Sequence, residues 1–153
     1  MGADTSQDGQ LAAARELRHG IRRAMAGVET ALAAPAPGRV EQWSADVSGR
    51  LEDLREAFRS HVALTESPTG FLAQIVDRAP RLVHAVDRLR AEHATIAAAL
   101  DDAAGTVRSA QGPDGVDAAR TAVVGLLQQL AHHRQRGADA VYEAYDVDIE
   151  AGD

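Results

Sequence analysis

The chain has 153 residues, of which 45% are hydrophobic, 25% are charged and none is cysteine. This is the composition of one folded globular domain, and without cysteine the chain has no disulfide, no catalytic thiol and no cysteine-ligated zinc. The formal net charge of −7 argues against a nucleic-acid partner, and the lack of an apolar run of about 18 residues argues against a membrane partner. Because the N-terminus is unlike a secretory signal, we expect a cytoplasmic protein.

The first predicted element is a helix over residues 8–33. Apolar residues recur there at alternating spacings of three and four, which is the periodicity of one buried helical face. Prolines at positions 35 and 37 and a glycine at position 38 end this helix. Its predicted buried face consists of Leu11, Ala14, Arg18, Ile21, Met25, Val28 and Leu32.

The second predicted helix covers residues 39–66 and shows the same alternation of spacings. Residues 67–70 should interrupt it, since Pro68 has no amide hydrogen and disfavours helical geometry at Ser67. Phe71 and Leu72 then begin a short apolar turn that we expect to cover one end of the domain. The predicted buried face of this helix consists of Val40, Ser44, Val47, Leu51, Leu54, Phe58 and His61.

The third predicted helix begins near Pro80, a favourable first-turn residue, and weakens at Gly105. Glycines and a proline between positions 112 and 115 separate it from the fourth helix, which spans about residues 116–145 and which Asp114 or Asp117 caps. The predicted buried faces are Leu82, Val86, Leu89, His93, Ile96 and Leu100 in the third helix, and Val116, Ala119, Val123, Leu126 or Leu127, Leu130, His133, Gly137 and Val141 in the fourth.

Four helices with short connections, and no strand-like alternation of useful length, predict an all-α protein. We expect an antiparallel up-down-up-down four-helix bundle in which neighbouring helices cross at about 20°. The bundle should form a single domain over residues 1–153, with frayed ends at residues 1–8 and 147–153.

Three of the six histidines, His61, His93 and His133, lie on the predicted buried faces of three different helices. A buried polar group without a partner costs about 1–3 kcal/mol, so each of these imidazoles needs a partner. Three imidazoles on facing helices are able to share a metal ion, because neutral imidazole is the commonest protein metal ligand. The alternative interpretation is structural, with each ring hydrogen-bonded to oxygen atoms of the protein. By helical phase, His84 and His132 should face solvent.

Carboxylates near these histidines are natural further ligands for a metal ion. Glu66 follows His61 by five residues and Asp139 follows His133 by six, which rotates them by about 140° and about 240° around an ideal helix. Neither spacing is the four-residue offset that places two ligands on one face. Glu66 precedes the proline break, where the helix can swing it inward, whereas Asp139 needs a bulge or a long reach. Further alternatives are Tyr142, Glu143 and Asp146.

Several stretches of the sequence resemble the hemerythrin-like family, also called the HHE cation-binding domain. The stretch HVALTESPTGFL is similar to the second-helix segment of that family, in which a carboxylate follows a histidine. LRAEHATI resembles its third-helix motif, LAHHRQRGADAVYEAY its fourth-helix motif and ELRHGIRRAM its first helix. Taken together with their order, these stretches extend the resemblance over most of the chain.

The resemblance implies a four-helix bundle around a non-heme di-iron centre that binds, senses or processes dioxygen, peroxide or nitric oxide. Applied to this sequence residue by residue, the resemblance implies a set of metal ligands. In this set His19 would be the histidine of the first helix and Asp139 the acid of the fourth helix. The ligands that match the family motifs most directly are His61, Glu66, His93 and His133.

The chain departs from the family pattern on two helices. Leu89 and Ala97 stand at the positions where a second third-helix histidine is often found, and Gly137 stands four residues after His133. The expected centre therefore holds one metal ion, an unusual pair of ions, or none. A centre poor in histidine favours sensing or peroxide chemistry over dioxygen storage, which needs tightly held iron.

We therefore expect a cytoplasmic iron-binding protein, with one or two iron ions, whose partner is a small diatomic or peroxide ligand. Arg134 or Tyr142 is expected to tune the metal. The alternative function is a metal-free four-helix bundle that acts as an interaction or structural protein. Other enzyme classes have little support, since the sequence contains no phosphate-binding glycine loop, no nucleophile elbow and no HExxH spacing.

Overall fold

The computed structural model describes residues 4–150, including every side chain in that range except those of residues 4–8, 10, 11, 14 and 147–150. No strand occurs in this part of the chain, so the predicted all-α class with four long helices is confirmed. The predicted fraying of residues 1–8 and 147–153, and the predicted burial of Leu11 and Ala14, lie outside the described side chains. The elements are α1 (Asp4–Ala33), α2 (Val40–Glu66), α3 (Phe71–Arg78), the 3-10 helix η1 (Pro80–Leu82), α4 (Val83–Arg108) and α5 (Gly112–Glu150).

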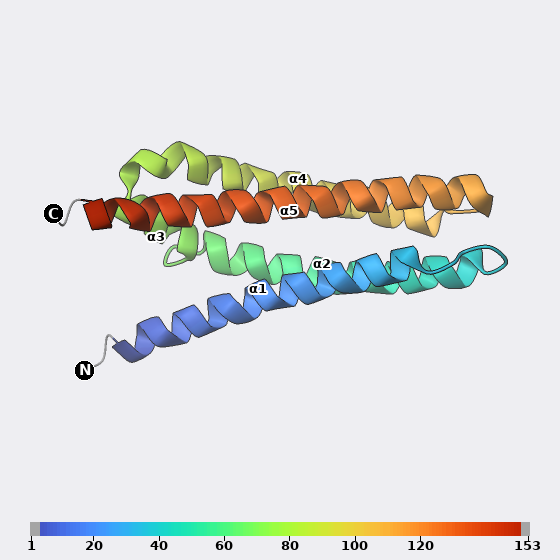
Figure 1. The fold of residues 1–153 in the computed structure, drawn as a ribbon, viewed down its shortest axis with the longest axis horizontal. Coiled ribbons are helices and arrows are strands. Elements are labelled where there is room, and N and C mark those ends of the chain that lie inside the picture. Colours follow the sequence, from blue (N-terminus) through green and yellow to red (C-terminus); the bar gives the residue numbers. More distant parts are fainter. Residues whose placement is uncertain (1–3, 151–153) are drawn as a thin grey trace.

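The four long helices lie side by side in an elongated bundle (Figure 1). In that view α1 and α4 run away from the end that holds both chain termini, and α2 and α5 run back toward it. Helix α1 packs along α2 and α4 packs along α5, while contacts between α2 and α4 join the two pairs. Helices α1 and α5 pack less closely, and α1 diverges from α5 toward its N-terminus (Figure 1).

The connection between α1 and α2 is a tight turn that also closes the end of α1. Gly38 has a φ of 75°, a conformation that glycine adopts without strain, and the amide of Arg39 donates to the carbonyl of Ala36 at 2.9 Å. The last carbonyls of a helix lack intrahelical partners, and here the indole N–H of Trp43 donates to the carbonyl of Leu32 at 3.4 Å. The side chain of a core residue thus ties the end of α1 to α2.

The predicted break after α2 is confirmed. Helix α2 ends at Glu66, and the amide of Gly70 donates to the carbonyl of Ser67 at 2.8 Å in the turn before α3. A Cβ atom at Gly70 would lie 2.4 Å from the carbonyl oxygen of Leu64, so the turn requires glycine because of this close approach. Helix α3 then covers one end of the bundle, with Leu72 buried against α4 and α5 (Figure 1).

The start of α5 differs from the prediction. The helix begins at Gly112, so Asp114 and Asp117 lie within it and do not cap it from outside. Gly112 has a φ of 64°, which turns the chain, and Pro113 has the fixed φ that suits the first turn of a helix. The predicted start near Pro80 is the start of the 3-10 helix η1, and α4 itself runs from Val83 through Gly105 to Arg108.

Two apolar clusters fill the bundle, and His93 lies between them on α4. The larger cluster, formed by α1, α2, α4 and α5, surrounds Trp43, which has no exposed surface. The smaller cluster is formed by α3, η1, α4 and α5. On α4, Leu89 belongs to the smaller cluster and Ile96 to the larger, so His93 marks the boundary. The smaller cluster comprises Leu72, Ile75, Ala79, Leu82, Val86, Leu89, Ala140 and Ala144.

The predicted buried faces differ from the structure at several positions. On α2, Trp43 is fully buried although it was not on the predicted face, and Val40 and Ser44 are only partly buried. Arg18 is exposed, whereas Ile21, three residues further along α1, is buried.

Near the end of α5, Ala140 and Ala144 are buried, whereas Gly137 and Val141 are only partly buried. The buried face of α5 is therefore displaced around the helix where it packs against α3.

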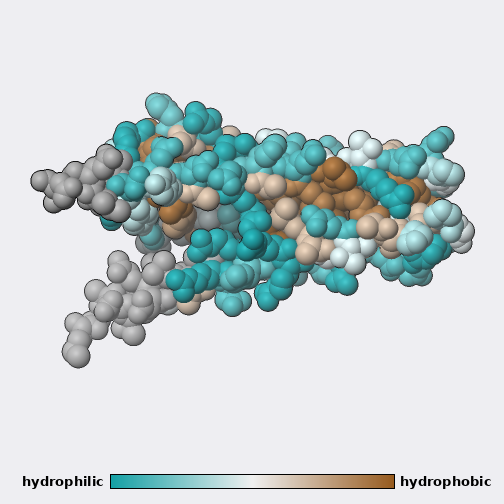
Figure 2. Space-filling model, viewed as in Figure 1, coloured by the Kyte–Doolittle hydropathy of each residue, from teal (hydrophilic) through white to brown (hydrophobic). Residues whose placement is uncertain are grey.

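The described helices present a largely hydrophilic surface in the view of Figure 2, interrupted by an apolar area between α1 and α5. Within the described residues, no helix combines the length and the hydropathy that a membrane span needs.

Candidate metal centre

Three imidazoles meet inside the bundle, one each from α2, α4 and α5. Nε2 of His133 lies 3.1 Å from Nε2 of His93 and 3.3 Å from Nε2 of His61. A ligand nitrogen of each ring lies within 4.8 Å of the others. His93 and His133 are buried and His61 is partly buried. The prediction that these three histidines, here called the histidine triad, form one cluster is confirmed.

Aromatic packing orients the rings of the triad. The centroids of His93 and His133 are 4.8 Å apart at an interplanar angle of 63°, and His61 is nearly perpendicular to both, at 88° and 84°. Phe58, three residues before His61 on α2, stacks on His61 with centroids 6.1 Å apart and meets His93 edge-on at 5.8 Å. Since Phe58 belongs to the larger apolar cluster, it forms an apolar wall of the site.

A carboxylate holds each buried histidine from behind. Nδ1 of His93 is 2.7 Å from Oε1 of Glu66, and Nδ1 of His133 is 2.7 Å from Oε2 of Glu92. The Nε–H of Arg136 donates to the other oxygen of Glu92 at 2.6 Å. Carboxylate–histidine pairs of this kind fix the ring and raise its basicity at metal sites. Glu66, which the sequence predicted as a direct ligand, thus contacts the far side of His93.

These contacts determine which ring nitrogens carry protons. An ionised carboxylate only accepts hydrogen bonds, so Nδ1 of His93 and Nδ1 of His133 carry the donated hydrogens. In neutral rings the two Nε2 atoms then bear lone pairs, and they face each other across 3.1 Å. A cation or a shared proton stabilises such an arrangement. His61 can satisfy His133 by donating from its own Nε2, but His93 then still lacks a donor.

The spacing of the nitrogens suits a metal ion. Metal–imidazole bonds of about 2.0–2.1 Å in a tetrahedral arrangement separate neighbouring nitrogens by about 3.3 Å. The measured separations of 3.1 Å and 3.3 Å from Nε2 of His133 are of this size. Three protein ligands leave a coordination position for water or a small ligand, as catalytic metal sites do.

The electrostatics favour the protonation states that a metal ion needs. Burial, together with the neighbouring histidines, lowers the pKa of His61 to about 3. Burial also lowers the pKa of His133, although its hydrogen bond with Glu92 acts in the opposite direction. Burial tends to raise the pKa of Glu92, but hydrogen bonds with Arg136 and His133 outweigh it and hold that pKa below its usual value. At neutral pH, His61 and His133 are therefore neutral and Glu92 is ionised.

The structure does not bring the other predicted candidates into the triad. His19 is exposed on α1, and Asp139 is exposed on α5, where it accepts a hydrogen bond from Gln135 at 2.9 Å. Because α5 is a continuous helix, its geometry keeps Asp139 turned away from His133. The predicted exposure of His84 and His132 is confirmed. The remaining alternatives also lie outside the triad: Tyr142, Glu143 and Asp146.

Glu92 is the residue of the site that the sequence prediction missed. It directly precedes His93 on α4, and adjacent helical residues point about 100° apart, so the two were not expected to serve one centre. Its partner comes from another helix, since α4 lies along α5 and brings Glu92 to His133. Arg136, three residues after His133, contacts the same carboxylate, but nothing in the sequence links Arg136 or His133 to Glu92.

Comparisons with protein-family models, with curated proteins and with solved structures found no match to this chain.

Proposed function

We propose that this chain is a metal-binding helical bundle in which Nε2 atoms of His61, His93 and His133 hold one divalent first-row metal ion. One observation carries most of the weight: two Nε2 atoms face each other at 3.1 Å on rings whose Nδ1 atoms contact carboxylates. Neither ring has a proton to donate to the other in that state, whereas a metal ion accepts both lone pairs.

One metal ion fits the arrangement better than two. One nitrogen of each imidazole lies within 4.8 Å of the other two, and Glu66 and Glu92 contact the opposite nitrogens of two of the rings. A second metal ion would need further ligands, and the described residues contain no other metal-binding group. The proposed centre is therefore mononuclear, with Glu66 and Glu92 as positioning residues.

Iron is the first metal to test, because the sequence resembles the hemerythrin-like family. The proposal takes the bundle as antiparallel and up-down-up-down, in agreement with the course of the helices in Figure 1. When bound, the metal would supply an open coordination position, Lewis acidity and, for iron, redox chemistry toward a small ligand such as peroxide, dioxygen or nitric oxide. Sensing or peroxide chemistry is favoured over storage, since three imidazoles hold the ion less tightly than a full di-iron ligand set.

The protein's own residues hold the site in place before the metal binds. Glu66 and Glu92 orient two of the rings, Arg136 orients Glu92, and Phe58 packs against His61 and His93. Ligands that are fixed in advance lose little freedom on binding, which strengthens metal affinity.

The second candidate is a metal-free bundle with a structural or interaction role. It is supported by the absence of unsatisfied buried side-chain atoms in the described part of the chain, since the histidines hydrogen-bond to carboxylates and to one another. In that case a proton shared between Nε2 of His93 and Nε2 of His133 would stabilise the two facing nitrogens, with His61 hydrogen-bonded to His133.

Calorimetric titration with ferrous iron under anaerobic conditions distinguishes the two candidates. We expect one ion per chain for the wild type. His93→Ala should lower the affinity at least about 100-fold, since it removes a ligand and leaves Glu66 without its partner. His84→Ala is the matched control, because His84 is exposed on the same helix, and should bind like the wild type.

Titrations with zinc and cobalt under the same conditions test the choice of metal. Cobalt absorption bands in the visible range report a tetrahedral nitrogen site. If the protein binds zinc or cobalt but not iron, the triad remains the proposed site and iron is no longer the proposed metal. Equal affinity of the wild type and His93→Ala, or no binding of any of the three metals by the wild type, would favour the metal-free bundle.

A further inference from the structure

Arg134 adjoins the triad, and in the described part of the chain neither it nor two nearby arginines of α1 have a carboxylate partner. Arg18 and Arg22 are exposed on α1, and Arg134, which directly follows His133 on α5, is partly buried. Among the described residues, none of the three forms an ion pair or a side-chain hydrogen bond, although the chain has a net charge of −7. Of the three, Arg134 is the partly buried one, and a cation that is partly buried usually has a partner of opposite charge.

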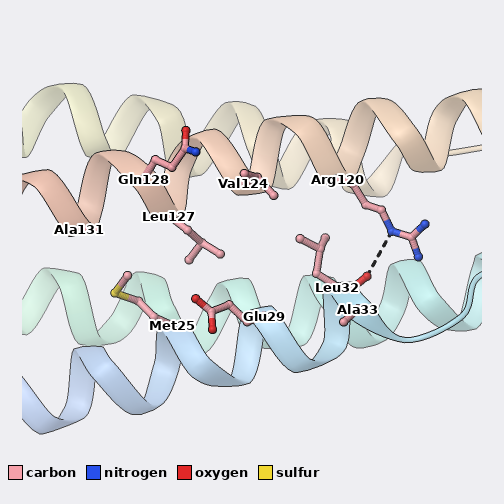
Figure 3. A pocket seen from close by; sticks show the side chains of 9 residues that line it. All are labelled: Met25, Glu29, Leu32, Ala33, Arg120, Val124, Leu127, Gln128 and Ala131. Atoms are coloured by element: carbon pink, nitrogen blue, oxygen red, sulfur yellow. Dashed lines mark hydrogen bonds between the residues drawn. The ribbon is translucent and has the colours of Figure 1, made fainter.

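The register between α1 and α5 places these arginines together. Arg120 on α5 donates to the carbonyls of Leu32 and Ala34 at 3.2 Å and 3.1 Å, which pins the end of α1 to the start of α5. Figure 3 shows the groove that continues from this contact, where Met25 on α1 lies across from Ala131 on α5. Along the groove, from the Arg120 contact toward Met25 and Ala131, residue numbers fall on α1 and rise on α5.

The next turns beyond Met25 and Ala131 carry the three arginines. On α1, Arg22 and Arg18 lie about 60° and about 20° around the helix from Met25. On α5, Arg134 lies about 20° from Leu127, which also lines the groove. All three therefore follow the faces that α1 and α5 turn toward each other.

The electrostatics agree with this placement. Burial lowers the pKa of Arg134, and the positive charges of Arg22 and Arg18 lower it further. Arg134 in turn is one of the charges that lower the pKa of His61. Arg22 and Arg18 thus lie close enough to Arg134 to repel it, and Arg134 acts on His61.

Nearby carboxylates are turned toward other partners. Glu92 binds Arg136 and His133, Asp139 accepts from Gln135, and Glu16 lies 4.0 Å from Arg23. Glu29 also lines the groove (Figure 3), but it follows Met25 on α1, on the side away from Arg22. Within the described residues, none of these carboxylates forms a hydrogen bond or an ion pair with Arg18, Arg22 or Arg134.

We propose that Arg18, Arg22 and Arg134 bind a small oxyanion, of the carboxylate or inorganic type, between α1 and α5 beside His61. Planar guanidinium groups donate in a fork that matches the two oxygens of such an anion. The arginine site needs no metal. The second part of the proposal is that the same anion also binds the metal ion, and this part rests on the proposed function.

Formate is a suitable probe, with formamide as a neutral molecule of the same size. Metal-free protein is titrated with each at constant ionic strength, because salt screens exposed charges. Nitrogen-15 NMR follows the Nε–H signals of the arginines. We expect saturable shifts for Arg22 and Arg134 with formate and none with formamide. Arg22→Gln and Arg134→Gln should each weaken formate binding roughly two- to fivefold, the range for partly exposed charge pairs.

Arg23→Gln is the matched control, since Arg23 is exposed, adjoins Arg22 and points toward Glu16. It should bind formate as the wild type does. Arg134→Gln should keep or raise the thermal midpoint, because it relieves repulsion between like charges. Should Arg134→Gln fail to fold, Arg22→Gln gives the same test on an exposed residue. Equal shifts with formamide, no saturation, or equal weakening in Arg23→Gln would overturn the proposal.

A metal-loaded titration separates this proposal from the metal site. If the triad binds metal, formate should bind more tightly after loading, since a cation is added beside the arginines. Unchanged formate affinity after loading would overturn the second step and keep the arginine site. Failure of metal binding itself would leave the metal-free titration, and hence the arginine site, unaffected.

Discussion

The larger apolar cluster and the histidine triad lie in one bundle, but different interactions hold them in position. In the cluster around Trp43 and Leu54, fully buried side chains stabilise the fold by apolar burial, which has little directional preference. In the triad, each buried ring needs a partner atom at hydrogen-bond distance, and Glu66 and Glu92 provide it. The comparison teaches that stability and binding are separable in this molecule, since the residues that fix the triad are not those that fill the cluster.

The largest expected effect concerns the apolar cluster. Trp43→Ala should lower the free energy of unfolding by about 3–5 kcal/mol, because it leaves a cavity and removes the indole bond to the carbonyl of Leu32. Urea denaturation measures this loss. Metal affinity, measured on the folded protein, should change by less than about twofold, since distant sites act independently. A parallel loss of metal affinity would show that the two regions are coupled.

The next largest effect concerns the carboxylates behind the triad. Glu92→Gln and Glu66→Gln should each weaken metal binding about 10- to 100-fold without abolishing it, because the rings lose orientation and basicity. Calorimetric titration measures both. Glu56→Gln, at an exposed position of α2, is the control and should have no effect. Wild-type affinity in the Glu92 variant would mean that the triad is positioned by packing alone, like the apolar cluster.

Acidification should distinguish the triad from the cluster in metal-free protein. The pKa of His61 is about 3 in the folded state, against 6.5 for an ordinary histidine, so between these values the unfolded chain binds a proton that the folded one does not. The free energy of unfolding should therefore fall as the pH drops below about 6.5, by up to about 1.4 kcal/mol per pH unit for each such histidine.

Urea denaturation at several pH values checks this slope. His61→Gln should reduce it, because glutamine does not titrate. Burial and the neighbouring charges also lower the pKa of His133, so part of the slope should remain in that variant. An identical slope in the wild type and His61→Gln would mean that His61 is protonated in the folded protein.

The smallest effect is expected for the exposed histidines. His84→Ala and His132→Ala should each change the free energy of unfolding by less than about 0.5 kcal/mol, and neither should change metal affinity. Thermal denaturation and metal titration of both variants test this. Loss of metal affinity in either would extend the site beyond the triad.

Local patterns in the sequence predicted the helices well. The alternation of three and four identified much of the buried faces of α2 and α4, although it missed Trp43. Pro68 with Gly70 identified the break before α3. These features depend on residues within one or two turns, so they are readable without the rest of the fold. The start of α5 was harder, since Gly112 and Pro113 act as the beginning of the helix and not as its breaker.

The candidate site was predicted in part. The positions of His61, His93 and His133 on three buried faces were enough to predict that the rings meet. Glu92 was missed because its partner lies on a different helix, and the sequence contains no direct information about which turn of α4 lies beside which turn of α5. For the same reason, the sequence did not show that Glu66 contacts Nδ1 of His93.

The sequence by itself determined the helices, their buried faces and the presence of three histidines on them, because helical periodicity is set by the backbone and by neighbouring residues. Only the tertiary structure decided the register between helices. The register places Nε2 of His93 opposite Nε2 of His133 and brings Glu92 of α4 into contact with His133 of α5. It also places the exposed Arg18 of α1 near Arg134 of α5. The reason is physical: interhelical register is fixed by how all the side chains pack at once, and no single helix contains that information.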